Sequence, residues 1–222
     1  MTKLLVIAEG QTEEAFVDKL IRPALEGRGV CTEARLVGRP GHKGGNVTFK
    51  RVVDDVEKYL RRGDGPYCTT LIDLYGLGRG FPSAEASSQR PGYDKVSSLE
   101  SDMVEEIKRR IGDSRVERRF IPYIQCYEFE ALLFSDPVGL ARGILREDLA
   151  AKFRKSRGGL PPEKLNSKAP PSKRISGIYG EYQKPTDGVE ASKKIGLEKM
   201  RRECPRFDAW MRQLEALGAV PA

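Results

Sequence analysis

The stretch KLLVIAEGQTEE, residues 3–14, decides the fold. Its continuous apolar run, Leu4–Ala8, is typical of a strand that lies inside a parallel sheet with both faces buried. The chain then reaches Gly10, which allows a tight turn, and Thr12, a residue type that favours the start of a helix. The stretch therefore predicts a buried strand, a glycine turn and a helix in direct succession.

The alternation of strand and helix continues as far as about residue 140. Hydrophobic periodicity predicts further strands at 31–37, 67–72 and 118–125, and helices at 49–60, 96–111 and 131–134. Alternating strands and helices form a parallel sheet with crossover helices. After residue 140 the pattern changes to short helices separated by glycine and proline pairs. We therefore expect an α/β domain in residues 1–140, with a mostly parallel sheet flanked by helices, and a basic, mainly helical extension packed on it in residues 141–222.

The composition limits the class of protein. Of the 222 residues, 39% are apolar and 32% are charged, which is typical of a soluble, ordered chain. No apolar run reaches the length of about 18 residues that a membrane span needs, and the first apolar run is too short for a secretory signal. We therefore expect a cytoplasmic protein without a membrane anchor. The four cysteines lie far apart without a Cys-x-x-Cys pair, which argues against a disulfide framework and a structural zinc site.

Missing residue types and motifs exclude several kinds of enzyme. His42 is the only histidine and lies in a glycine-rich stretch, so sites that need two histidines are excluded. The sequence contains neither a Walker A motif nor a Gly-x-Ser-x-Gly elbow. Carboxylates are therefore the expected carriers of any chemistry.

Positive charge is concentrated in the second part of the chain. Residues 1–140 hold 21 basic and 22 acidic side chains, whereas residues 141–222 hold 18 basic and 10 acidic side chains. A basic region suits a polyanionic partner, because neutralising phosphates releases counterions. We predict a nucleic-acid partner, DNA rather than RNA; a solvated surface with an accidental bias is the alternative. The basic side chains expected to contact the nucleic acid are Lys43, Arg119, Lys173 and Arg174.

Three acidic residues stand at the ends of predicted strands: Glu9, Asp73 and Glu128. In a parallel sheet, ligands bind at the carboxyl ends of the strands, so these residues should share one edge. A cluster of carboxylates repels itself unless a cation compensates it, and carboxylate oxygens are ligands that Mg²⁺ takes. Glu13 lies four residues after Glu9 and could add a ligand. Structural alternatives remain open: Glu13 as a partner of the helix dipole, Asp73 as a turn former, and Glu128 with Glu130 at the start of a helix.

Five blocks of the sequence carry a resemblance to a known family. They are EGQTE at 9–13, LIDLYGL at 71–77, FIPYIQCYEFEALLF at 120–134, PSKRI at 171–175 and CPRFDAW at 204–210. The blocks resemble those of the Toprim-like domain-of-unknown-function family 4276. The resemblance covers most of the chain and implies a Toprim-like, Rossmann-like sheet.

The resemblance also implies a metal-dependent chemistry. Toprim domains of topoisomerases, primases and overcoming-lysogenisation-defect nucleases hold divalent metal with a glutamate after the first strand and an Asp-x-Asp after a later one. Glu9 and Asp73 match the glutamate and the first aspartate. Tyr75 stands in place of the second aspartate, and a phenol is a poor metal ligand at neutral pH. Tyr127 stands where the family has a histidine, which removes one general acid.

Together the residues and the resemblance predict a divalent-metal-dependent phosphodiesterase or nuclease. Metal ions in such a site would activate water for in-line attack and neutralise charge on the transition state. The expected catalytic residues are Glu9, Glu13, Asp73 and Glu128. We hypothesise that the same four residues, with Glu130, hold Mg²⁺ or Mn²⁺ in a two-metal arrangement.

The resemblance further implies an ATPase partner and a role in defence against foreign DNA. One alternative is a non-catalytic module that binds nucleic acid or a partner protein through a degenerate Toprim site, and Tyr75 favours it. Another is a scaffold that binds neither metal nor nucleic acid.

Overall fold

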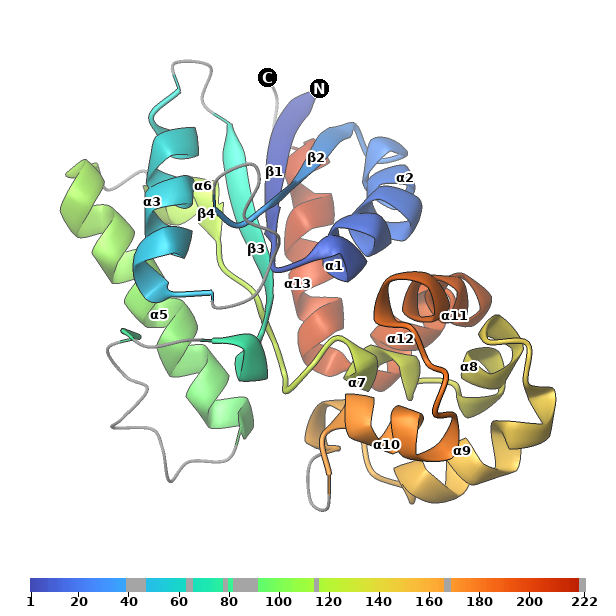
Figure 1. Ribbon diagram of the computed structural model, residues 1–222. Coiled ribbons are helices and arrows are strands. Elements are labelled where there is room, and N and C mark those ends of the chain that lie inside the picture. The colour runs from blue at the N-terminus through green and yellow to red at the C-terminus, as the bar shows by residue number, and fades with distance from the viewer. Residues whose placement is uncertain are drawn as a thin grey trace.

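The computed structural model describes residues 1–38, 47–62, 66–77, 80–81, 92–113, 116–165 and 169–219. Its centre is a five-stranded parallel sheet in the order β2-β1-β3-β4, with β5 paired to the end of β3. Helices cover both faces of the sheet (Figure 1), which confirms the expected α/β fold. The strands are β1 (Thr2–Ala8), β2 (Val30–Leu36), β3 (Tyr67–Asp73), β4 (Phe120–Ile121) and β5 (Ile124–Gln125).

Strand β1 separates the two hydrophobic cores of the protein. Its side chains alternate between the two faces of the sheet, so that Leu4 and Val6 join one core, whereas Leu5 and Ile7 join the other. All four side chains are buried, which explains why the sequence is apolar at every one of these positions. Each contributes about 1.5–3 kcal/mol to stability through its burial.

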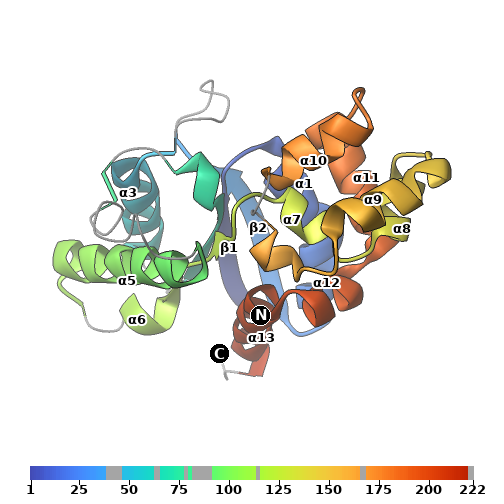
Figure 2. The ribbon, with the colours of Figure 1, turned by 90° about the horizontal axis from the view of Figure 1, so that it is seen from below.

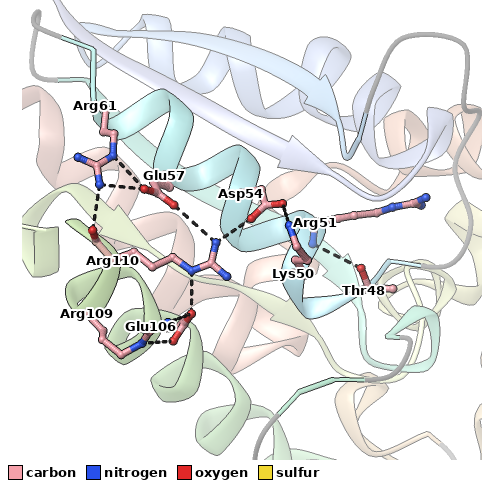
Figure 3. Close-up of polar contacts among 9 residues, drawn as sticks. All are labelled: Thr48, Lys50, Arg51, Asp54, Glu57, Arg61, Glu106, Arg109 and Arg110. Carbon is pink, nitrogen blue, oxygen red and sulfur yellow. Dashed lines mark hydrogen bonds and ion pairs between the residues drawn. The ribbon is translucent and has the colours of Figure 1, made fainter.

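Two helices cover one face of the sheet: α3 (Phe49–Leu60) and α5 (Gly92–Ile111). An ion-pair network centred on Arg110 joins them (Figure 3). The Arg110 guanidinium lies 2.7 Å from Asp54 and 3.5 Å from Glu57 on α3, and 2.7 Å from Glu106 on its own helix. Because these groups are partly exposed to water, the network contributes less to stability than the apolar contacts beneath it.

Three helices cover the opposite face: α1 (Gln11–Phe16), α2 (Arg22–Glu26) and α13 (Pro205–Ala216). Trp210 on α13 donates a hydrogen bond from Nε1 to the Thr69 hydroxyl on β3 at 2.8 Å. Its indole also stacks on the ring of Tyr123, with 4.4 Å between the ring centroids. Helix α13 therefore packs directly on β3 and on the segment between β4 and β5.

The short helices from α7 to α12 form a helical cluster beside the carboxyl ends of the strands (Figure 1). Seen from below, this cluster and the pair α3 and α5 lie on opposite sides of the sheet (Figure 2). The apolar side chains of the helical cluster belong to the same core as Leu4 and Val6. The division of the chain into two domains at residue 140 stays a prediction. The helices are α7 (Glu130–Leu133), α8 (Pro137–Gly143), α9 (Ala150–Arg157), α10 (Pro171–Ile178), α11 (Val189–Ile195) and α12 (Leu197–Glu203).

Within the ranges that the structure describes, no helix is both long enough and apolar enough to cross a membrane.

The strand predicted at 118–125 is wrong in part. Residues Val116–Arg119 form a helical turn, α6, and the following strand is divided into β4 and β5. The division falls at Pro122, which has no N–H to donate to a neighbouring strand. At the next residue, the Tyr123 N–H donates to the Thr70 hydroxyl at 2.9 Å instead of to a strand carbonyl. The displaced β5 continues beside the end of β3, where it pairs with Ile72 and Asp73.

Replacing Trp210 by alanine tests the docking of α13. Loss of the stacked indole and its hydrogen bond should lower the free energy of unfolding by about 3–5 kcal/mol. Urea denaturation followed by circular dichroism measures the change, and Trp210→Phe should recover part of it. Leu145→Ala is the control, because that side chain is 88% exposed. A loss below about 1 kcal/mol for Trp210→Ala would mean that α13 does not hold the sheet.

Candidate active site

The ends of β1 and β3 bring two of the predicted acidic residues together. Glu9 follows β1, and its N–H donates to the carbonyl of Leu71 on β3 at 3.1 Å. Asp73 is the last residue of β3, and its N–H donates to Oε2 of Glu9 at 2.8 Å. The Glu9 carboxylate is therefore held across the edge of the sheet by the backbone of the neighbouring strand.

Gly76 makes room for the Glu9 carboxylate. It ends the helical turn Leu74–Gly76 that follows β3. A Cβ atom at Gly76 would overlap both carboxylate oxygens of Glu9. The Glu9 carboxylate can therefore occupy its place only because residue 76 is glycine.

Glu13 closes the turn between β1 and α1. Its Oε2 accepts a hydrogen bond from the N–H of Gly10 at 3.0 Å, and the residue is only 4% exposed. Helix α1 begins at Gln11, directly after Gly10, so the prediction that Thr12 caps the helix is wrong. The reason is that the Glu13 side chain reaches back to the turn and Gly10 adopts the extended backbone that precedes the helix.

Lys184 is the cation of the acidic cluster. Its Nζ lies 2.9 Å from Oε2 of Glu130 and 3.9 Å from Oδ2 of Asp73. Glu130 is the completely buried first residue of α7, and its Oε1 accepts a hydrogen bond from the Tyr182 hydroxyl at 3.5 Å. The ammonium group thus joins acids from two different parts of the chain.

The segment that carries Lys184 packs against the first helix. Lys184 opens a π-helical turn, Lys184–Gly188, which leads into α11. A Cβ at Gly188 would lie 2.9 Å from the Tyr182 hydroxyl, 3.4 Å from Phe129 and 3.7 Å from Thr12. The close approach of Gly188 to these side chains fixes the turn, and with it Lys184, beside the carboxyl ends of the strands.

Burial sets the electrostatics of the cluster. It raises the pKa of Asp73 well above the usual value, and the carboxylates of Glu13 and Glu9 raise it further. Burial also raises the pKa values of Glu9, Glu13 and Glu130, and the Lys184 ammonium opposes the rise in each case. For Lys184, burial lowers the pKa, but Glu130 and Asp73 outweigh that effect and raise it above the ordinary value. The four acids therefore tolerate their burial with the help of one lysine.

Glu128 lies near the cluster, but its carboxylate has other partners. Its oxygens accept hydrogen bonds from the backbone N–H of Ser172 at 2.8 Å and from the Ser172 hydroxyl at 3.0 Å. These bonds tie the end of β5 to the first turn of α10. The Glu128 charge still contributes to the raised pKa values of Glu9 and Glu130.

The donor chemistry of the cluster fits a hard divalent cation. Carboxylate oxygens are the preferred protein ligands of Mg²⁺. Asp73 Oδ1 is buried and accepts no hydrogen bond from any residue that the structure describes. Across the described ranges, however, no group of three or more His, Cys, Asp or Glu side chains is arranged to hold a metal. As the side chains stand, Lys184 supplies the positive charge between Asp73 and Glu130.

The predicted nucleic-acid contacts have several different environments. Lys173 is exposed on α10. Arg119 donates from Nη1 to the carbonyl of Leu60, and Arg174 donates to the carbonyls of Ala169 and Ser156. These two arginines therefore have structural partners, and a role in binding nucleic acid stays a prediction. Lys43, like His42, lies outside the described residues.

Sequence reasoning missed Lys184 and Tyr182. Neither residue belongs to a strand end, and both lie more than fifty positions after Glu130 or Asp73 in a stretch without a periodic pattern. A buried carboxylate such as Glu130 needs a cation or hydrogen-bond donors, so a basic residue beside it was to be expected. The sequence alone does not say which of the many lysines and arginines it is.

Two tyrosines lie close in the chain to acids of the cluster. Tyr75, two residues after Asp73, is 45% exposed, and Tyr127 precedes Glu128. Their ring centroids lie 5.6 Å apart with an interplanar angle of 53°. The Tyr75 N–H donates to the Tyr127 carbonyl at 3.0 Å.

Comparison with known proteins identifies the family. The model of the domain of unknown function DUF4276 matches residues 8–215, and the chain belongs to this family, as its sequence blocks indicated. A search of the curated proteins found no match.

Two solved structures are similar to the chain. The C-terminal region of the OLD protein from Burkholderia pseudomallei is 15% identical, with a TM-score of 0.45 and 97% of this chain and 96% of that chain covered. The C-terminal region of the OLD protein from Xanthomonas campestris pv. campestris is 11% identical, with a TM-score of 0.42 and 99% and 97% covered.

Substitution of Gly76 tests its role as the seat of Glu9. Gly76→Ala should lower the free energy of unfolding by about 1–3 kcal/mol, because the new methyl group displaces the Glu9 carboxylate. In a Glu9→Ala background the same change should cost much less, which a double-mutant cycle by chemical denaturation measures. Gly177→Ala is the control, since nothing lies within 4 Å of a Cβ there. Equal costs in both backgrounds would show that the carboxylate does not rest on Gly76.

Removal of Lys184 tests the compensation of the acids. Lys184→Met should cost about 2 kcal/mol at neutral pH, less than a fully buried pair, because 39% of the lysine side chain is exposed. An acid whose pKa is raised by folding makes the folded protein less stable as pH rises. The loss begins near the pKa of the unfolded chain, about 4, and continues up to the pKa of the folded protein. The variant, whose acids lack the cation, should therefore differ little from wild type near pH 5 and strongly near pH 8 in melting temperature.

Two variants control this experiment. Adding Glu130→Gln to Lys184→Met should recover part of the lost melting temperature near pH 8, because it removes one uncompensated charge. Lys152→Met, at an exposed position on α9, should leave the melting temperature unchanged at both pH values. A Lys184→Met deficit that is the same at both pH values would rule out the electrostatic explanation.

Proposed function

We propose that this member of the DUF4276 family is a divalent-metal-dependent phosphodiesterase, a nuclease with a Toprim-like site at the carboxyl edge of its sheet. The observation that carries the proposal is the meeting of Glu9, Asp73 and Glu130 with Lys184. Two buried carboxylates, a partly buried one and an ammonium at the edge where parallel sheets bind ligands are costly to stability, and such groups mark functional sites.

Asp73 and Glu9 would hold the metal, with Glu13 and Glu130 as further ligands. Asp73 Oδ1, which lacks a hydrogen-bond partner among the described residues, supports this assignment. Bound Mg²⁺ or Mn²⁺ would activate water and neutralise charge on the phosphate. The assignment of Glu128 is weaker, because both of its oxygens bind Ser172.

The protein's own groups orient the site. The Asp73 N–H fixes the Glu9 carboxylate, and the Gly10 N–H fixes that of Glu13. Lys184, held by Glu130, presents a positive charge to an incoming phosphate oxygen. A preorganised ammonium stabilises negative charge that develops on the phosphate during the reaction.

The wider setting of the reaction is also part of the proposal. We expect a cytoplasmic enzyme that acts on DNA, with the basic second part of the chain, including Lys173, along the path of the strand. The sequence contains no Walker A motif, and an ATPase partner is part of the proposal because the family resemblance suggests one. Defence against foreign DNA is the role that the family resemblance suggests.

One observation favours a second function, a non-catalytic module that binds nucleic acid. Lys184 pairs with the same acids that a metal would use, and Tyr75 occupies the position of a second metal-binding aspartate. An internal cation of this kind can keep the fold stable without any metal.

Cleavage of plasmid and single-stranded DNA with Mg²⁺ or Mn²⁺ separates the two functions. We expect metal-dependent cutting by the wild type and a loss of about 100-fold or more in Asp73→Asn, Glu9→Gln and Lys184→Gln. The control variant is Glu147→Gln, which changes an exposed acid that pairs with Arg142, and it should cut like wild type.

Three outcomes are informative in this assay. Cutting that survives Asp73→Asn and Glu9→Gln would disprove a site at this edge. Salt-sensitive DNA binding without cutting, with or without added ATPase partner, would favour the non-catalytic module. A larger loss in Glu128→Gln than in Glu9→Gln would move the site toward α10.

A further inference from the structure

Tyr75 and Tyr127 form an aromatic pair next to the acidic cluster that the proposed chemistry does not use. Their ring centroids are 5.6 Å apart, and the rings are tilted by 53°. Tyr75 is 45% exposed, one of the few large hydrophobic side chains among the described residues with this much exposure. Tyrosine is enriched at binding interfaces, because it offers an apolar ring together with a polar hydroxyl.

A hydrogen bond joins the backbone segments that carry the two rings. The Tyr75 N–H donates to the Tyr127 carbonyl at 3.0 Å, which links the segments that follow β3 and β5. The neighbouring side chains Leu74 and Cys126 are buried, and Gly76 lies against Glu9. The segments that carry the two rings are therefore joined to each other and packed on the core.

The backbone conformation of Tyr127 is a second unusual feature. Its φ is 65°, in the left-handed region that residues other than glycine rarely adopt. Such a conformation costs free energy and persists where the surrounding structure enforces it, commonly at functional sites. In this chain it accompanies the placement of the Tyr127 ring against Tyr75.

We propose that Tyr75, supported by Tyr127, stacks on an unpaired nucleobase of a strand that enters the acidic site. This inference rests on the proposed nuclease function and names its substrate class, single-stranded or frayed nucleic acid. A base offers a flat π face to an aromatic ring, and its phosphate would lie toward Asp73 and Lys184. Bases inside a duplex are already stacked on their neighbours, so a duplex cannot use the pair without losing that stacking.

Stacking would also offset the repulsion between the acids of the site and the phosphates of a nucleic acid. Glu9, Glu13, Asp73 and Glu130 repel a phosphate backbone, and Lys184 offsets only part of their charge. A contact between uncharged rings and a base adds affinity that does not depend on charge. The contribution of the pair should therefore persist at salt concentrations that weaken phosphate contacts.

Fluorescence of 2-aminopurine, which stacking quenches, tests the inference. Full-length wild type, Tyr75→Phe, Tyr75→Leu and Tyr75→Ala are titrated with single-stranded oligonucleotides that carry one 2-aminopurine, and with the matching duplex, in Ca²⁺ to limit cutting. We expect quenching by wild type and Tyr75→Phe, loss of quenching in the other two, and an affinity for single strands about tenfold lower in Tyr75→Ala. Duplex affinity should remain the same.

Tyr67→Ala is the matched control, because Tyr67 lies at the opposite end of β3. It should leave quenching and affinity unchanged. Melting temperatures of all variants show that they are folded, and Tyr75→Leu keeps the apolar volume without a ring.

The outcomes separate this inference from the proposed function. Metal-dependent cutting and single-strand binding that are equal in wild type and Tyr75→Ala, without quenching, overturn the stacking role alone and leave the proposed nuclease function standing. A wild type that neither binds nor cuts single strands overturns both proposals. Equal loss of single-strand and duplex affinity in Tyr75→Ala overturns the preference for unpaired bases.

Discussion

The pairing of Lys184 with Glu130 and Asp73 is the interaction on which the candidate site depends. Glu13, Asp73 and Glu130 are buried and Glu9 is partly buried, and loss of contact with water raises the pKa of each of them. Without a cation, such a group of acids either takes up protons or opens to solvent. Because the ammonium comes from the segment before α11, the acidic edge is complete only when the helical cluster is packed on the sheet.

That dependence joins the two parts of the chain. Glu128 reaches from the end of β5 to Ser172 on α10, and Trp210 of α13 reaches back to Thr69 on β3. Each of these contacts links residues that are distant in sequence and lie on either side of the predicted boundary at residue 140. The second part of the chain therefore does more than supply positive charge. It supplies α13, which covers one face of the sheet, and Lys184, which pairs with the acids of the site.

Sequence reasoning succeeded where a local pattern has a direct structural meaning. The apolar run of β1, the period of α5 and the position of Asp73 at a strand end all follow from residues that are neighbours in the chain. Two failures concern local details that the hydrophobic period does not report: Pro122 interrupts the strand predicted at 118–125, and the Glu13 side chain caps the helix so that it begins at Gln11. The third failure, Lys184, depends on contacts between residues that are distant in the chain. The position of Lys184 depends on the packing of Gly188 against α1, which no local pattern reveals.

The division of the interior into two cores has a consequence for local unfolding. Segments of a protein open with different free energies, often as contiguous units. Lys184 belongs to the half of the molecule that contains α11, whereas α3 and α5 pack in the other half beneath the Arg110 network. Local opening of the α11 half would withdraw the lysine while the other core stays intact. The time for which the acids stay paired with Lys184 would then be set by this partial opening, which costs less free energy than unfolding of the whole chain.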